Sequence, residues 1–227
     1  MNRFLFPRWI NKFLPIFGLL LLAGAGYAGT LFLGATDDDT LNPGFAPEQP
    51  VPFSHVIHAG KLKMDCRYCH TGVDKGAAAT IPPTSTCINC HSPLDRQTST
   101  PKLSAVHPAS DKLKAVHQSW ETNKSIPWTR IHRLPDFVFF NHSAHVNRGV
   151  SCVVCHGRVD TMERVFQAKP LSMAWCVDCH SNPNPNLRPT EFVTKLDWTT
   201  ENPEELGAKL ADENNIHPKI NCAVCHR

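Results

Sequence analysis

All ten cysteines of this 227-residue chain fall into one repeated pattern. Each pair is separated by two residues and followed directly by histidine, so that C-x-x-C-H occurs at residues 66–70, 87–91, 152–156, 176–180 and 222–226. This spacing is the attachment signature of c-type haem. Two thiols one short turn apart can form thioethers to the two vinyl groups of one porphyrin, and the next residue can present its imidazole to the iron. Each motif therefore predicts two covalent anchors and one axial ligand.

The prediction is five covalently attached c-type haems. The anchoring thiols are those of Cys66, Cys69, Cys87, Cys90, Cys152, Cys155, Cys176, Cys179, Cys222 and Cys225. The proximal iron ligands are His70, His91, His156, His180 and His226. Zinc knuckles use two C-x-x-C pairs for each metal, so five pairs would leave one over. A disulfide framework would suit an exported chain, but it gives no reason for five histidines at the same offset.

Further histidines are available for the opposite, distal side of each iron. They are His55, His58, His107, His117, His132, His142, His145 and His217. This supply is sufficient for two histidines on every iron, and an iron with two protein ligands transfers electrons because no position is open for substrate. Methionine is the other possible distal ligand. Met173, three residues before Cys176, is the best-placed methionine, and a core-filling role for its side chain is equally open.

Two similar stretches divide the chain. The hexad F-x-H-x-x-H occurs at residues 53–58 and again at 140–145, and each copy is followed by two C-x-x-C-H motifs. Self-similarity of this kind marks a repeated structural unit. We therefore expect two di-haem units. The predicted divisions are a linker at 37–52, di-haem unit 1 at 53–92, an intervening segment at 93–139, di-haem unit 2 at 140–181, and a C-terminal segment with the fifth haem at 182–227.

The elements that position these motifs are predicted to be short. Only 41% of the residues are hydrophobic and 19 are proline, which argues against a doubly wound sheet or a barrel. We expect a mostly irregular and α-helical multihaem cytochrome c, with porphyrins forming much of the apolar interior. Residues 203–214 predict a surface helix with Asn202 as its N-cap.

The net charge of +3 and the lack of a basic stripe exclude nucleic acid as a partner.

The N-terminal region predicts a membrane anchor. Residues 13–36 contain no charge and are long enough to cross a bilayer as a helix. Basic residues precede this run and acidic residues follow it: Arg3, Arg8 and Lys12, then Asp37, Asp38 and Asp39. By the positive-inside rule, residues 1–12 are cytoplasmic and the haem domain lies on the periplasmic side of the cytoplasmic membrane. A cleaved signal peptide is the alternative, but its apolar region is usually about 7–15 residues. We expect an uncleaved, single-pass anchor.

The two hexads resemble those of class III multihaem cytochromes c. In that family the first histidine of the hexad caps the iron of the next haem motif, and the second caps another haem. The resemblance implies His55 for the haem of His70, His142 for the haem of His156, and His58 and His145 for other haems of the cluster. His132, close before the second unit, is favoured as a further ligand. His107, His117 and His217 compete for the remaining positions.

The whole chain resembles the membrane-anchored pentahaem cytochrome c subunit of alternative complex III, a quinol-oxidising complex of bacteria. The N-terminal helix, the 2+2+1 arrangement of motifs, both hexads and the stretch 126–137 (IPWTRIHRLPDF) carry the resemblance. It implies that electrons from quinol pass through an iron–sulfur subunit and this haem chain to a mono-haem cytochrome subunit. The downstream acceptor would be a soluble cytochrome c, a copper protein or an oxidase. This subunit alone would bind no quinol and break no substrate bond.

Two other functions are kept as alternatives. The anchored tetrahaem quinol dehydrogenases of nitrate and nitrite respiration also have one N-terminal helix, but this chain has a fifth motif and a long insert. Pentahaem nitrite reductases are multihaem enzymes that replace the histidine of one motif with lysine to open a catalytic iron. All five motifs of this chain end in histidine.

Overall fold

The computed structural model describes residue 7 and residues 9–36, 42–94 and 105–226. Most of the charges that flank the apolar run lie outside the described residues: Arg3, Arg8, Asp37, Asp38 and Asp39. The same holds for part of the predicted linker and for residues 95–104 of the intervening segment.

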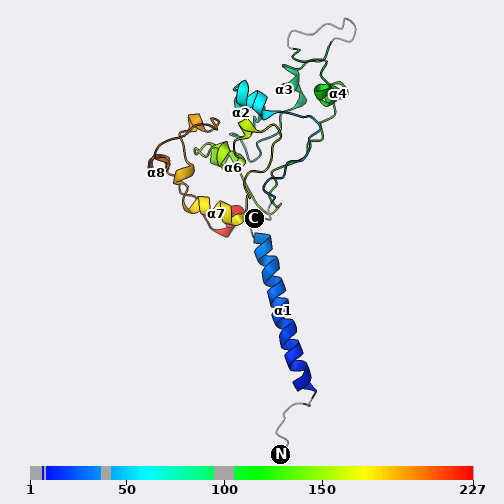
Figure 1. Cartoon of the computed structure of the whole chain (residues 1–227). Helices are drawn as coiled ribbons and strands as arrows, with labels where there is room; N and C mark the ends of the chain where they lie inside the picture. The colour runs from blue at the N-terminus through cyan, green and yellow to red at the C-terminus, as the bar shows by residue number, and fades with distance from the viewer. Residues whose placement is uncertain (1–6, 8, 37–41, 95–104, 227) are drawn as a thin grey trace, which may run out of the picture.

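The apolar run forms one long helix, α1 (Ile10–Thr36), which begins three residues before the predicted segment. Its first turn is set at Trp9, whose carbonyl accepts hydrogen bonds from the amides of Lys12 and Phe13. Residues Ile10–Gly34 are long and apolar enough to cross a membrane. A signal sequence near the N-terminus meets the same criterion. Figure 1 shows α1 as a separate rod that extends away from the rest of the chain.

The remainder consists of short helices joined by loops. The α-helices are α2 (Cys66–Cys69), α3 (Thr84–Ile88), α4 (Lys114–Thr122), α5 (His142–Val146), α6 (Cys152–His156), α7 (Met173–Ser181), α8 (Pro203–Glu213) and α9 (Cys222–Cys225). A π-helical turn, η2 (Val56–Lys61), and the 3₁₀ turns η3 (Asp111–Leu113), η4 (Val159–Thr161), η5 (Asn184–Asn186) and η6 (Thr190–Phe192) complete the described elements. The described residues form isolated β-bridges but no sheet. The predicted fold class, mostly helical and irregular, is confirmed.

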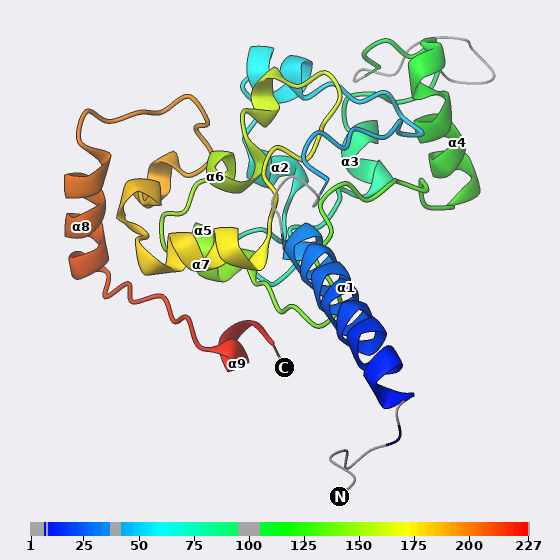
Figure 2. The same cartoon turned by 60° about the horizontal axis from the view of Figure 1, so that its bottom comes forward.

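The predicted surface helix is α8, which ends at Glu213, one residue earlier than expected. Figure 2 shows it at one edge of the molecule, with α3 and α4 at the opposite edge. Gly207 lets α8 lie against the carbonyl of Asn184 in η5, where a Cβ atom would collide. Asn202 is the N-cap residue, as predicted, but its side chain makes no capping hydrogen bond, and its amide instead donates to Glu205 Oε2 at 3.4 Å.

The side-chain core of the described chain is small. Val73, Val146 and Val193 form its central cluster, with Ala79 packed against them. These residues come from unit 1, unit 2 and the C-terminal segment, so the cluster lies where the three meet. The low hydrophobic content of the sequence predicts that apolar side chains alone do not fill the interior. The small size of this cluster agrees with that prediction.

Candidate functional site

Every C-x-x-C-H motif is carried by a short helix. Helices α2, α6 and α9 begin at the first cysteine of their motifs, and α3 and α7 contain the first cysteine of theirs. Polar side chains directly before three of the helices cap them: Asp65 accepts from the Arg67 amide at 2.8 Å, Ser151 from the Val153 amide at 3.5 Å, and Ser172 from the Trp175 amide at 3.0 Å. A side-chain acceptor at the N-cap satisfies a helix donor that lacks a partner and fixes where the helix starts.

Three of the motif histidines are held in the same way. Their Nδ1 atoms donate to backbone carbonyls: His70 to Thr80 at 2.7 Å, His91 to Val106 at 2.8 Å and His180 to Lys219 at 3.0 Å. A carbonyl can only accept, so the proton lies on Nδ1 and the lone pair on Nε2 is free. This is the usual arrangement of a histidine that binds a metal.

Three distal candidates are held in the same orientation. His58 Nδ1 donates to the Ser54 carbonyl at 2.9 Å, His145 to Asn141 at 2.8 Å and His142 to Ala77 at 2.7 Å. The first two bonds each lie within a hexad, whereas the third joins unit 2 to unit 1. These rings therefore also present Nε2 as the free nitrogen.

The two hexads have matching ring geometry. In unit 1, Phe53 stacks on His58 at 4.3 Å between ring centres and meets His55 edge-on at 4.9 Å. In unit 2, Phe140 stacks on His145 at 4.5 Å and meets His142 edge-on at 4.8 Å. One phenylalanine thus orients both histidines of its hexad, which explains the residue spacing.

Three distal candidates pair with motif histidines at similar separations. The ring centres are 6.1 Å apart for His58 and His91, 6.1 Å for His145 and His180, and 6.4 Å for His142 and His156. Two imidazoles on opposite sides of one metal have ring centres about 6 Å apart, because a metal–nitrogen bond is about 2 Å. The donor set and its spacing therefore fit a haem iron between each pair.

The remaining hexad histidine, His55, is also suited to a metal. Its Nδ1 is buried without a hydrogen-bond partner. Burial, followed by the neighbouring His70 and His58, lowers its pKa to about 4. Burial likewise lowers the pKa of His145 and of His132, and it lowers that of His156 to about 3 with help from His132 and other histidines. These imidazoles are neutral at pH 7, the form that binds a metal.

The structure places the other predicted ligands differently. His132 lies edge-on to His156 with ring centres 4.3 Å apart, closer than the paired histidines. His117 Nε2 lies 3.0 Å from the carbonyl of His91. His107 and His217 are exposed, and Met173 is 70% exposed. The ring of Phe137 lies 5.7 Å from that of His226.

Hydrogen bonds, a shared cavity and neighbouring residues connect the motifs one after another. Asn89 of the second motif donates to the Tyr68 hydroxyl of the first at 3.3 Å. The first and third motifs are joined through residues 193 and 194: the Val193 carbonyl accepts from the Cys152 amide at 3.3 Å, and the Thr194 carbonyl lies 4.0 Å from Cys66 Sγ. A cavity of about 290 Å³ is lined by residues of the third and fourth motifs, including Val153 and Cys179. The His180 bond to the Lys219 carbonyl ties the fourth motif to the residues before the fifth.

None of the ten cysteines forms a disulfide. Within the part of the chain that the structure describes, no group of three or more His, Cys, Asp or Glu side chains is placed to hold a metal ion by itself.

Comparison with known proteins gives matches to both halves of the chain. Residues 35–126 match the class III cytochrome c family, and residues 138–227 match the family of cytochrome c7 and related cytochromes c. This chain is a multihaem cytochrome c. The multihaem cytochrome c subunit of menaquinone reductase from Nitratidesulfovibrio vulgaris is 28% identical over 157 residues, which cover 60% of this chain and 70% of the relative. Electron transport and the binding of haem iron follow from the matches.

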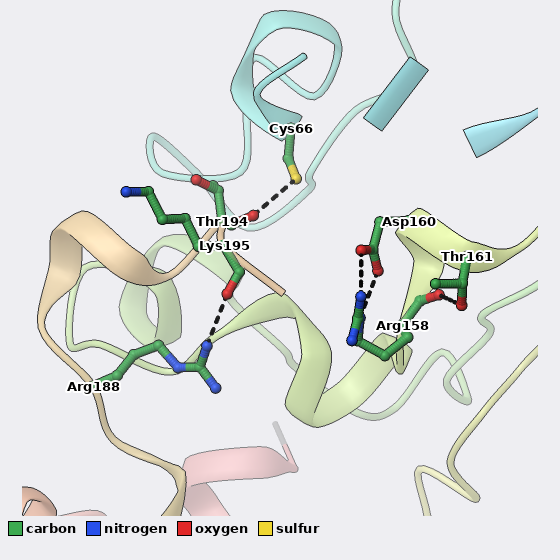
Figure 3. A network of polar contacts seen from close by, with 7 residues as sticks. All are labelled: Cys66, Arg158, Asp160, Thr161, Arg188, Thr194 and Lys195. Atoms are coloured by element: carbon green, nitrogen blue, oxygen red, sulfur yellow. Dashed lines mark hydrogen bonds and ion pairs between the residues drawn. The ribbon is translucent and has the colours of Figure 1, made fainter. Parts of the chain in front are cut away.

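One functional segment of this cytochrome was missed by the sequence analysis. Residues 193–195 join the first and third motifs: the Val193 carbonyl accepts from Ser151 Oγ at 2.7 Å, and Thr194 Oγ1 donates to Asp65 Oδ2 at 2.7 Å. Figure 3 shows the Thr194 carbonyl facing Cys66 and the Lys195 carbonyl held by Arg188. The segment contains neither cysteine nor histidine, and it acts mostly through backbone carbonyls, which leave no signal in the sequence.

Proposed function

We propose that this cytochrome is the electron-transfer subunit of a membrane complex that oxidises quinol, and that it holds five covalently attached c-type haems. The observation that carries the proposal is the set of three histidine pairs 6.1–6.4 Å apart. When bound, haem with two histidine ligands supplies reversible one-electron chemistry without an open position for substrate. The protein's part is to hold each imidazole at a fixed tautomer and orientation.

The proposed axial pairs follow the repeat. His55 and His70, His58 and His91, His142 and His156, and His145 and His180 would hold the four haems of the two units. In each unit the first hexad histidine serves the first motif and the second serves the second motif. This extends the implication of the class III resemblance, because it names the haems that His58 and His145 reach. His226 would be the proximal ligand of the fifth haem.

The contacts between motifs support a row in the order 87–91, 66–70, 152–156, 176–180 and 222–226. Its ends are therefore the second and fifth motifs. Just after the anchor, Gly44 and Phe45 exchange backbone hydrogen bonds with Gln167, six residues before α7. Only five residues separate residue 42 from α1, a reach of about 20 Å at most. Figures 1 and 2 both draw one end of α7 near the end of α1.

This geometry favours one orientation of the row of motifs relative to the membrane. The α7–α9 end would face the membrane subunits, and the α3 end would face a partner away from the membrane. With α1 as an uncleaved single-pass anchor, the haem domain would lie on the periplasmic side. The partners would be an iron–sulfur subunit and a mono-haem cytochrome subunit of the complex, with a soluble cytochrome c, a copper protein or an oxidase downstream.

A second function is favoured by one observation. The relative at 28% identity is named as a subunit of a menaquinone reductase, so the same row could serve electron exchange with menaquinone rather than delivery to an alternative complex III acceptor. The anchored quinol dehydrogenases of nitrate and nitrite respiration would use it in a related way.

The test uses the membrane complex purified with this subunit in place. We expect an intact mass for the subunit that exceeds its amino acids by five haems, low-spin spectra, and no carbon monoxide binding by the reduced protein. We also expect reduction by a menaquinol analogue that needs the other subunits. Fewer than five haems, or substantial carbon monoxide binding, would contradict the proposal. Reduction of the isolated subunit by the analogue would favour the dehydrogenase, and oxidation of the reduced haems by menaquinone would favour the reductase.

A further inference from the structure

His156 is held differently from three of the other motif histidines. His70, His91 and His180 donate from Nδ1 to backbone carbonyls at 2.7–3.0 Å. His156 Nδ1 instead lies 3.3 Å from Nε2 of a side chain, that of His132. The two rings are nearly perpendicular, with an interplanar angle of 85°. His132 thus occupies the place that a carbonyl takes at those three motifs.

We propose that His132 is a positioning residue for the third haem motif, where its Nε2 accepts a hydrogen bond from the Nδ1–H of His156. This inference rests on the proposed function, in which His156 binds iron through Nε2. A neutral imidazole has one acceptor nitrogen, so the Nε2 lone pair that accepts this bond is not available for a metal. The sequence analysis favoured His132 as a distal ligand, and the geometry points to a different role.

The distal position opposite His156 is filled by another residue. His142 lies 6.4 Å from His156 between ring centres, with ring planes within 8° of parallel. Its own Nδ1 is held by the Ala77 carbonyl, which leaves its Nε2 free. His132, at 4.3 Å and edge-on, is too close to share a metal with His156. The two histidines near His156 therefore have separate roles.

The backbone around His132 is held by hydrogen bonds that begin at Gln49, in the segment after the anchor. The Gln49 side chain bonds both backbone groups of Thr129: its amide donates to the carbonyl at 2.8 Å, and its Oε1 accepts from the amide at 2.9 Å. Arg130 Nε then donates to the His132 carbonyl at 3.1 Å. These contacts hold the backbone on which His132 lies, and none of them involves His156.

A side-chain acceptor has a consequence that a carbonyl does not. Hydrogen bonding at Nδ1 raises the basicity of a metal-bound imidazole, and a more basic axial ligand stabilises the ferric form. Removing the acceptor by mutation should therefore raise the midpoint potential of one haem. No side-chain substitution can remove the acceptor of His70, His91 or His180, because those acceptors are backbone carbonyls.

The experiment compares His132→Leu, which removes the acceptor, with His132→Gln, which restores an acceptor oxygen, and with His142→Leu. All are made in the intact complex and measured by intact mass, carbon monoxide binding and spectroelectrochemical titration. We expect His132→Leu to retain five low-spin haems without carbon monoxide binding and to raise one midpoint potential, with His132→Gln closer to the native value. We expect His142→Leu to create one high-spin haem that binds carbon monoxide.

Several outcomes would overturn the inference. A high-spin, carbon monoxide-binding haem in His132→Leu would make His132 a distal ligand, and five unshifted potentials would make it merely structural. If His132→Leu does not accumulate, Gln49→Ala is measured in its place. A smaller rise of the same midpoint potential supports the inference, and unchanged midpoint potentials contradict it. A native subunit with fewer than five haems would instead be a failure of the proposed function.

Discussion

The two hexad units are alike in one part and different in another. Their Phe–His–His ring centres are separated by distances that match within a few tenths of an ångström, although His58 lies on the π-helical turn η2 and its counterpart His145 on α5. The supports of the first motif in each unit differ. In unit 1 the motif follows an exposed N-cap, Asp65, whereas in unit 2 it follows Ser151, which is 1% exposed. A shared local pattern thus orients the hexad histidines, whereas the support of the motif that follows differs between the units.

The largest difference should appear when one motif loses its cysteines. The third motif bonds the Val193 carbonyl and lines a cavity with the fourth motif, whereas the second motif is proposed to lie at one end of the row. Both Cys152→Ala/Cys155→Ala and Cys87→Ala/Cys90→Ala should lose one haem by intact mass. Because bound groups stabilise the folded state, we expect a severalfold lower yield of folded protein for the third-motif variant. The second-motif variant should accumulate nearly normally. Equal yields would show that the contacts of the third motif contribute no more to folding than those of the second.

A glycine in unit 2 should show the next largest effect. Gly149 has a φ of +85° and would place a Cβ against the carbonyl of Arg188. We expect Gly149→Ala to cost on the order of 3 kcal/mol in unfolding free energy, because a left-handed backbone and a collision with main chain combine.

Gly44 is the matched control. It has nearly the same φ, +83°, but a Cβ atom at this position would have nothing within 4 Å of it. Gly44→Ala should therefore cost only about 1 kcal/mol, the penalty of the backbone conformation. Thermal unfolding of the two holoprotein variants checks this, and equal losses would mean that the Arg188 contact adds nothing.

The candidate ligands were more predictable from the sequence than the residues that support them. The five motifs and both hexads stand out because cysteine and histidine chemistry demands fixed local spacing. Helix α8 was also predictable, since Pro203 and the acidic residues after it mark a helix start. The Val193–Lys195 segment was not, because it acts through backbone carbonyls brought in from more than 40 residues away. The role proposed for His132 could not be predicted for a related reason: spacing cannot tell a metal ligand from a hydrogen-bond partner of one.

The two N-caps offer a smaller test of the same comparison. Ser151 Oγ is buried and donates to the Val193 carbonyl, whereas the Thr194–Asp65 bond is exposed. We expect Ser151→Ala to cost about 1–2 kcal/mol, since it loses both a buried hydrogen bond and a helix cap. Thr194→Val removes one bond that water can replace and should cost about 0.5 kcal/mol. Chemical denaturation of the holoprotein measures both, and a larger loss for Thr194→Val would reverse the assignment.

The smallest effect concerns an aspartate that occurs after the first motif of both units. In unit 2, Arg158 donates two hydrogen bonds of 2.8 Å to the carboxylate of Asp160 and holds its pKa below the usual value. In unit 1, the Asp74 carboxylate is 4.0 Å from Arg67 Nε. Arg158 is about half exposed, so we expect Asp160→Asn to cost about 0.5–1 kcal/mol at pH 7 and Asp74→Asn less.

The pKa of Asp160 determines how the stability contribution of this ion pair changes with pH. A carboxyl with a depressed pKa in the folded state contributes stability above its unfolded pKa, about 3.9, and loses it as the pH falls through the lower folded value. The difference in stability between the native protein and Asp160→Asn should therefore be constant from pH 7 to about pH 5 and close below about pH 4. Denaturation midpoints across this range measure it. A difference that persists at the lowest pH would mean that Asp160 acts through packing rather than through its charge, and that the two units do not differ in this ion pair.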